Sequence, residues 1–232
     1  MTSHEPSPQC PFCNIANTYP PLTPTTFLRQ QDPKNVSNNP ATSTSTSTTM
    51  ITTPPISPTA TTAHLILSTT SLLAFLDIMP LTRGHILLAT REHYEKLGDV
   101  KVGVSREVSS IGQWLPILSR VVMRTLFGAS DDEAADWCWN VVQNNGVRAA
   151  QQVPHVHFHV IPRPNLDGSG GGGRPSFVMF GRGQRDELDE EEGEELARCL
   201  REELAREVVR LRDVEGVDLE GEFAGRCLLS KL

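Results

Sequence analysis

The chain has 232 residues, of which 38% are hydrophobic, enough to build one full core. Its net charge of −7 gives no support to nucleic-acid binding through a basic face, and no apolar run is long enough to cross a bilayer, so we expect neither a nucleic acid nor a membrane as partner. Five cysteines, an odd number, and an N-terminus without a secretory signal pattern favour reduced thiols. We therefore expect an intracellular protein, in the cytoplasm, the nucleus or both.

Composition divides the chain into five segments. Residues 1–17 carry a Cys-x-x-Cys pair. Residues 18–62 consist largely of Thr, Ser, Pro and Asn, which bury too little apolar surface to offset chain entropy, so we interpret them as a disordered insertion. The predicted domain core covers 63–165. A flexible glycine-rich loop is expected over 166–183, followed by a helical extension over 184–232.

Hydrophobic periodicity predicts the elements of the core and the extension. Strands are expected over 71–78, 85–89, 137–142 and 155–161. Helices are expected over 92–97, 105–127 and 187–211. The last of these is the clearest, because its leucines form one stripe, its start is acidic and its second half carries arginines, as the helix dipole favours.

The strand over 155–161 carries an unusual pattern. Side chains alternate between the two faces of a strand, so His155, His157 and His159 are predicted to share one face while apolar residues occupy the other. The apolar face can pack against helices and fix the strand. The other face presents titratable rings in a row, a pattern that packing does not explain.

Three interpretations of the histidine face compete. The least specific is a polar outer surface. A second is a metal site built from three histidines. The third uses one imidazole as a covalent nucleophile toward phosphorus, with its neighbours orienting it and holding the phosphate. The loop before the strand, 144–154, is rich in amide side chains, which are donors suited to phosphate oxygens, and this favours the nucleophile.

The segment 155–161 resembles, at every position, the signature of the histidine triad family of nucleotide hydrolases and transferases, His-φ-His-φ-His-φ-φ with φ apolar. Further matches to the family pattern are Asn144-x-Gly146, Gln151, Phe75-x-Asp77-Ile78, Pro80, Gly84-His85 and His93. The resemblance covers 10–13 and 63–163. It implies an α+β fold, with an antiparallel sheet of about five strands and flanking helices, and a homodimer.

The resemblance also implies catalytic roles. His157 is expected to attack the α-phosphorus of a nucleotide and to form a nucleotidyl-imidazole intermediate that water or another acceptor resolves. The far nitrogen of His157 should donate to a backbone carbonyl and so fix the tautomer. His159 is expected to hydrogen-bond the phosphate or the leaving oxygen, and Asn144 and Gln151 to hold the non-bridging oxygens.

Substrate contacts follow from the same resemblance. Asp77 is expected to accept from the ribose hydroxyls, with Phe75 and Ile78 near the base. Small family members often carry serine or threonine where this chain has Gln152, so the leaving group is handled differently here. Three arginines near the triad, at 163, 182 and 185, are interpreted as solvated, although they lie within reach of a substrate phosphate.

The Cys-x-x-Cys pair, Cys10 and Cys13, is by itself as compatible with redox chemistry as with a metal. Some family members and their sugar-nucleotide transferase relatives bind zinc through such a pair and two histidines. The matching histidines here are His93 and His155. The resemblance therefore implies a closed, structural zinc site that fastens residues 1–17 to the core.

We predict a hydrolase or nucleotidyltransferase that acts on a nucleoside phosphate conjugate or a dinucleoside polyphosphate, without an organic cofactor. Two alternatives stay open. One is a nucleotide-binding regulatory or scaffold protein with little turnover. The other is a three-histidine metal hydrolase.

Overall fold

The computed structural model describes residues 8–28, 63–102, 107–128, 137–164 and 185–223. Its centre is a five-stranded antiparallel sheet with the strand order β1-β2-β3-β5-β4. The strands are β1 Leu65–Ser68, β2 Leu72–Leu76, β3 Ile86–Thr90, β4 Trp139–Gln143 and β5 His157–Pro162. The helices are α1 Pro11–Thr18, α2 Glu107–Phe127 and α5 Glu190–Arg210. The predicted α+β architecture is confirmed.

Short helical turns complete the described structure: η1 Pro24–Phe27, η2 Leu97–Asp99, η3 Val147–Ala149, η4 Leu211–Glu215 and η5 Glu220–Glu222. No described helix combines the length and the apolar character needed to span a membrane.

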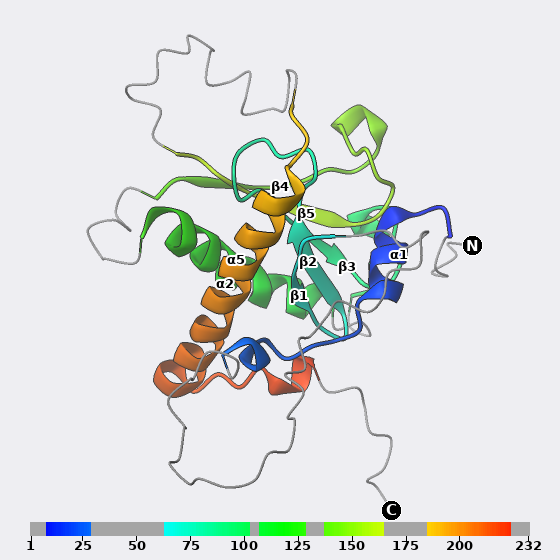
Figure 1. The fold of residues 1–232 in the computed structure, drawn as a ribbon. Coiled ribbons are helices and arrows are strands. Elements are labelled where there is room, and N and C mark those ends of the chain that lie inside the picture. The colour runs from blue at the N-terminus through cyan, green and yellow to red at the C-terminus, as the bar shows by residue number, and fades with distance from the viewer. Residues whose placement is uncertain (1–7, 29–62, 103–106, 129–136, 165–184, 224–232) are drawn as a thin grey trace, which may run out of the picture.

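The sheet has two differently covered faces. On one face, residues at every second strand position pack against α2 and α5 and form the main core, with Trp114 fully buried at its centre. The other face carries Leu73, Phe75, Leu87 and Ala89, which pack against α1. Figure 1 shows α2 and α5 on one side of the sheet and α1 on the other. Because α1 covers only part of its face, the rest is left for a site.

The extension is fastened to the core by α5. Asp189 caps this helix, since its Oδ1 accepts from the backbone N–H groups of Glu191 and Glu192, each at 3.0 Å. Glu207 is buried between α2 and α5 and pairs with Arg120, Arg124 and Arg210. The extension therefore contributes core side chains and a buried ionic cluster to the fold.

Several predicted boundaries were wrong. The short helix expected over 92–97 is absent, and η2 follows instead at Leu97–Asp99. The strand β1 was not predicted separately, because its four residues are too few for a clear alternation. The strand predicted over 155–161 begins only at His157.

The first part of the predicted disordered insertion is ordered. Leu22 bridges to Ser68, η1 covers Pro24–Phe27, and the guanidinium of Arg91 donates to the carbonyl oxygens of Ala16 and Tyr19 at 2.6 and 3.0 Å. These contacts satisfy backbone acceptors that composition alone does not reveal. The remainder of the predicted insertion, 29–62, and the predicted glycine-rich loop over 166–183 lie outside the described residues.

Candidate active site

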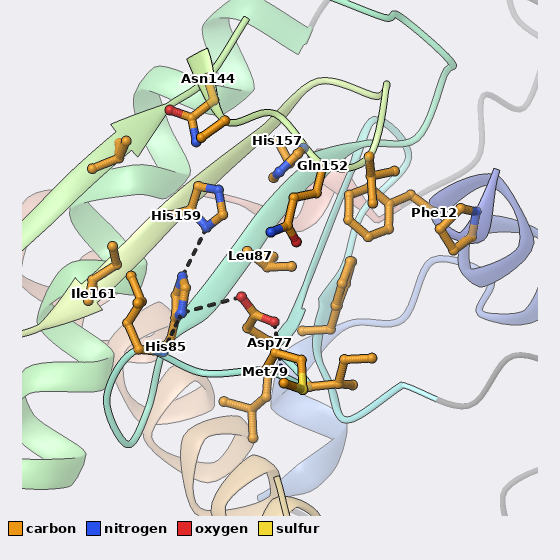
Figure 2. Close-up of a pocket in the computed structure, with 18 of the residues that line it drawn as sticks. Phe12, Asp77, Met79, His85, Leu87, Asn144, Gln152, His157, His159 and Ile161 are labelled. Atoms are coloured by element: carbon orange, nitrogen blue, oxygen red, sulfur yellow. Dashed lines mark hydrogen bonds and ion pairs between the residues drawn. The ribbon is translucent and has the colours of Figure 1, made fainter. Parts of the chain in front are cut away.

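A cavity of about 660 Å³ opens on the sheet face opposite α2 and α5 (Figure 2). Alternation along the strands directs one set of side chains into it: Phe75, Leu87, Asn140, Val142, His157, His159 and Ile161. Its volume lies within the range of about 300–1,000 Å³ that is usual for sites holding a whole small-molecule ligand.

His157 lines this cavity with its ring fixed by the backbone. Its Nδ1 lies 2.6 Å from the carbonyl oxygen of His155, which can only accept, so Nδ1 carries the proton and donates it. This is the expected bond from the far nitrogen to a backbone carbonyl. The Nε2 atom therefore keeps its lone pair, on a ring that lines the cavity. Burial lowers the pKa of His157, against the opposing effects of the bond to His155 and the charge of Asp77.

His85 fixes the tautomer of His159. The backbone N–H of Leu81 donates to His85 Nδ1 at 3.1 Å, so the proton of the neutral His85 ring lies on Nε2. That nitrogen is 3.0 Å from His159 Nδ1 and donates to it (Figure 2). His159 is thus left with its own N–H at Nε2, where it can donate to a phosphate oxygen.

Both rings of this pair are neutral at pH 7. Burial, followed by the charge of His159, lowers the pKa of His85 to about 3. Burial, followed by the charge of His157, lowers the pKa of His159 to about 4. The pair therefore works as a fixed chain of hydrogen bonds, and the direction of each bond is set by the backbone amide of Leu81.

Asp77 supplies the acidic group of the cavity. Its Oδ1 accepts from the backbone N–H of Met79 at 2.9 Å. Its Oδ2 lies 3.3 Å from His85 Nδ1 but receives no hydrogen bond from the neutral ring, because that nitrogen accepts from Leu81. Burial raises the pKa of Asp77, while the bond from Met79 and the charge of Arg185 lower it. A carboxylate has about four acceptor positions, so Asp77 retains capacity for ligand hydroxyls.

The structure brings most of the predicted site residues to one cavity: Phe75, Asp77, Ile78, Asn144, Gln152, His157 and His159. Gln151, predicted to hold a phosphate oxygen, is the exception, because it does not line the cavity. Its Oε1 accepts from the backbone N–H of Gly146 at 2.6 Å, and its Nε2 donates to the carbonyl oxygen of Glu95 at 2.7 Å. The buried Gln151 side chain thus links the loop that precedes β5 to the backbone of Glu95. Gln152, in contrast, points into the cavity (Figure 2).

Sequence analysis did not predict that two further residues, Phe12 and Arg185, line the cavity. Phe12, the residue before Cys13, sets its ring edge-on to those of Phe75 and His157, with centroids 5.3 and 5.1 Å apart. Arg185 also lines the cavity, although it was interpreted as solvated. No periodic pattern marks either residue, because Phe12 stands in a short helix and Arg185 precedes α5.

The four predicted metal ligands also converge. Cys10 Sγ lies 3.4 Å from His155 Nδ1, and Cys13 Sγ lies 3.3 Å from His93 Nδ1 and 3.8 Å from His155 Nδ1. Tetrahedral zinc with ordinary Zn–S and Zn–N bonds separates sulfur and nitrogen ligands by roughly 3.5 Å. All four ligand atoms lie within 4.8 Å of one another, and both cysteines and His155 are buried.

His155 is also oriented as a zinc ligand needs. Its Nε2 lies 2.8 Å from the carbonyl oxygen of Thr90 and donates to it, which leaves the lone pair on Nδ1, the atom facing the cysteines. The residues present therefore fit a closed Cys₂His₂ zinc site. His155 precedes β5 and its Nδ1 faces Cys10 and Cys13, whereas His157 and His159 line the cavity.

Comparison with known proteins identifies the family. The HIT domain model matches residues 59–166. Adenosine 5′-monophosphoramidase of Schizosaccharomyces pombe is 38% identical over 107 residues, which cover 46% of this chain and 69% of that protein. The chain belongs to the histidine triad family. An uncharacterized HIT-like protein of Methanocaldococcus jannaschii is 34% identical over 118 residues, covering 51% of this chain and 77% of that protein.

A solved structure agrees in fold. A hypothetical histidine triad nucleotide-binding protein from Sulfolobus tokodaii superimposes with a TM-score of 0.50 at 19% sequence identity, covering 68% of this chain and 91% of that one. The matched HIT domain contains the triad, His85 and Asp77, whereas Cys10, Phe12, Cys13 and Arg185 lie outside the matched span. The cavity is therefore assembled from the shared domain and from segments on either side of it.

Proposed function

We propose that this protein hydrolyses conjugates of nucleoside 5′-phosphates through a nucleotide bound covalently to His157. The observation that carries the proposal is the tautomer of His157, whose Nδ1 donates to the carbonyl of His155 and whose Nε2 keeps a lone pair in the cavity. The printed activity of the fission yeast relative, an adenosine 5′-monophosphoramidase, supports a nucleotide hydrolase.

The reaction proceeds in two balanced steps. The Nε2 lone pair of His157 attacks the α-phosphorus, an N–P bond forms, and the bond from phosphorus to the leaving group breaks with its electron pair on the leaving atom. Water then attacks the same phosphorus and the N–P bond breaks, so its electron pair returns to Nε2. The water gives one proton to solvent, and the products are the nucleoside monophosphate and the free leaving group.

Neighbouring residues hold the reacting groups. His159 donates from Nε2 to a non-bridging oxygen, and Asn144 supplies a second donor from the loop after β4. Asp77 accepts from the ribose hydroxyls. Gln152 projects into the middle of the cavity, where its amide hydrogen-bonds the leaving group (Figure 2).

An apolar wall of the cavity holds the nucleobase. Phe12, Phe75 and Ile78 line the cavity near Asp77, and the T-shaped contact of Phe12 with Phe75 leaves an aromatic surface for a purine or pyrimidine. This wall joins α1 to β2, so binding of the base depends on how firmly α1 is held.

A structural zinc ion belongs to the same proposal. Cys10, Cys13, His93 and His155 would hold it, and it would supply a cross-link between α1 and the loop before β5 without entering the reaction. The link would fix two groups used by the site. One is Phe12, which lies between the cysteines, and the other is the carbonyl of His155, which orients His157.

A homodimer is proposed from the open edge of the sheet. The edge strand β4 pairs with β5 on one side, and within the described chain no strand pairs with its other side. It exposes Trp139 and Val141, which are 42% and 45% accessible. An apolar, unpaired edge of this kind favours pairing with a second copy.

The three-histidine metal hydrolase is not supported. Of the described side chains, the groups able to share a metal are Cys10, Cys13, His93 and His155, and separately Asp77, His85 and His159. Neither group contains all members of the triad. The scaffold alternative stays open, because a protein with negligible turnover would keep the same cavity.

Hydrolysis by purified protein tests the function. A panel of adenylate conjugates with amine, phosphate and sulfate leaving groups should yield AMP, and His157→Asn should abolish turnover while keeping AMP binding. His64→Asn is the matched control, because His64 is equally buried but packs against α5 away from the cavity. Binding of AMP with no turnover of any conjugate by the parent protein would favour the scaffold.

A further inference from the structure

Arg185 is the one cationic side chain among the described residues that line the cavity. It comes from the extension, a few residues before the Asp189 cap of α5. Its Nη1 donates to the carbonyl oxygen of Met79 at 3.0 Å, which ties the extension to the loop after β2. A guanidinium has five N–H donors, so this bond positions the group while leaving donors for a ligand.

The charge of Arg185 acts on the reacting end of the cavity. Burial lowers the pKa of His159 most, the charge of His157 comes second, and the charge of Arg185 lowers it further. It also lowers the pKa of Asp77, against the larger effect of burial. Arg185 lines the same cavity as His159 and Asp77, so a ligand in that cavity can contact all three.

The chemistry at His157 does not need this cation. The phosphate that His157 attacks already has donors in His159 Nε2 and Asn144, and Asp77 is committed to hydroxyls. Within the described chain Arg185 forms no ion pair with a carboxylate, although a partly desolvated cation gains most from an anionic partner. A guanidinium fork matches the oxygens of a phosphate better than any neutral group.

We propose that Arg185 selects substrates that carry a second phosphate in addition to the one that His157 attacks. This inference rests on the proposed function and narrows its substrate class. The second phosphate can occupy either of two positions in the substrate. It is esterified to the ribose that Asp77 holds, or it is the next phosphate of a polyphosphate chain. The cavity of about 660 Å³ has room for a nucleotide with either group.

The residue is a feature that the extension adds to the family's domain. The HIT domain match ends at residue 166, whereas Arg185 reaches the cavity from the far side of that boundary. The extension thus gains a role in specificity beside its role in the core.

Nucleotide binding to the purified full chain tests the proposal. Isothermal titration would compare AMP with adenosine 2′,5′- and 3′,5′-bisphosphate, which place the second phosphate on the ribose, and with ADP, which places it in the chain. The variants are Arg185→Gln and Arg185→Lys. Arg83→Gln is the matched control, since Arg83 pairs with Glu192 at the surface, outside the cavity, and its loss changes the net charge equally.

The parent should bind one of the doubly phosphorylated nucleotides about 10- to 100-fold more tightly than AMP, as expected for a charge-assisted hydrogen bond. Arg185→Gln should remove this preference, Arg185→Lys should keep part of it, and Arg83→Gln should leave it intact. If the parent prefers a bisphosphate, the second phosphate is the one on the ribose. If it prefers ADP, the second phosphate is the next one in a polyphosphate chain.

Equal binding of all four nucleotides by the parent would overturn the proposal, as would an equal loss of affinity in Arg185→Gln and Arg83→Gln. Its failure is distinguishable from failure of the proposed function. A protein that binds and turns over adenylate conjugates without any preference refutes only the role of Arg185, whereas a protein that binds none of the four nucleotides refutes both.

Discussion

The docking of the extension depends on a helical position that has no room for a side chain. Gly193, in the first turn of α5, faces the ring of His64 just before β1, and a Cβ built at Gly193 would lie 2.4 Å from His64 Nε2 and 2.6 Å from Cε1. Ordinary contacts between such atoms are about 3.5–4.0 Å. Gly193→Ala therefore requires a shift of about 1 Å in a buried ring that also lies between Glu190 and Glu194.

Two effects oppose each other in Gly193→Ala. Overpacking of this kind costs about 1–3 kcal/mol, whereas alanine in place of glycine favours a helix by up to about 1 kcal/mol. We expect the variant to lose about 1–2 kcal/mol of unfolding free energy. When His64→Ala removes the ring, the same Gly193→Ala substitution should become neutral or stabilising.

Urea denaturation of the parent, the two single variants and the double variant measures this coupling. The interaction free energy should be about 1–3 kcal/mol, with the double variant more stable than the sum of the single effects predicts. Effects that add to within about 0.5 kcal/mol would refute the contact between Gly193 and His64, and with it this packing of the extension.

Four further predictions concern the site and the fold. Ala150 lines the cavity with a left-handed backbone (φ 63°), so Ala150→Gly should raise the unfolding free energy by about 0.5–1 kcal/mol in thermal denaturation, and a loss of stability would contradict this. His85→Asn removes the donor to His159 and should lower kcat about 10-fold or more in steady-state kinetics with little change in KM; an unchanged kcat would remove His85 from the positioning of His159. Burial acts to raise the pKa of Glu207, but its bonds from arginines prevail and lower the pKa from 4.5 to about 2, so its stabilisation is complete above pH 4.5 and is lost as the pH falls through 2. Glu207→Gln should accordingly destabilise the protein strongly at pH 7 and much less near pH 2, and a pH-independent effect in denaturant titrations would oppose this. Purified protein should contain about one zinc per chain by elemental analysis, with both zinc content and thermal midpoint lowered in Cys10→Ser; a parent protein free of zinc would exclude the metal site.

The sequence predicted those features that depend on local periodicity. Alternation alone placed His157 and His159 on one face opposite Phe158, and helical spacing gave α2 in spite of Pro116. The motifs around Asp77 and Asn144 located the other walls of the cavity. These predictions succeed because, in a strand or helix that is buried on one side, residue number determines the direction in which each side chain points.

The misses occurred where tertiary contacts decide. Gln151 and Gln152 are adjacent amides, and only the burial of Gln151 between backbone groups of two loops determines which one lines the cavity. His155 keeps the predicted alternation, since its ring contacts Phe12 as that of His157 does, but the strand itself begins only at His157. Arg185 reaches the cavity because α5 docks against α2, and no pattern near residue 185 encodes that long-range packing.

The covalent step at His157 can be observed directly. Protein mixed with an adenylate conjugate and quenched in alkaline denaturant within milliseconds should gain the mass of one adenylyl group in denaturing mass spectrometry. The group should map to the peptide containing His157, resist alkali and be released by acid, as a histidine N–P bond requires. His157→Asn should give no such adduct. Full turnover by the parent without a trappable adduct, or adenylyl transfer in His157→Asn, would contradict a nucleophilic His157.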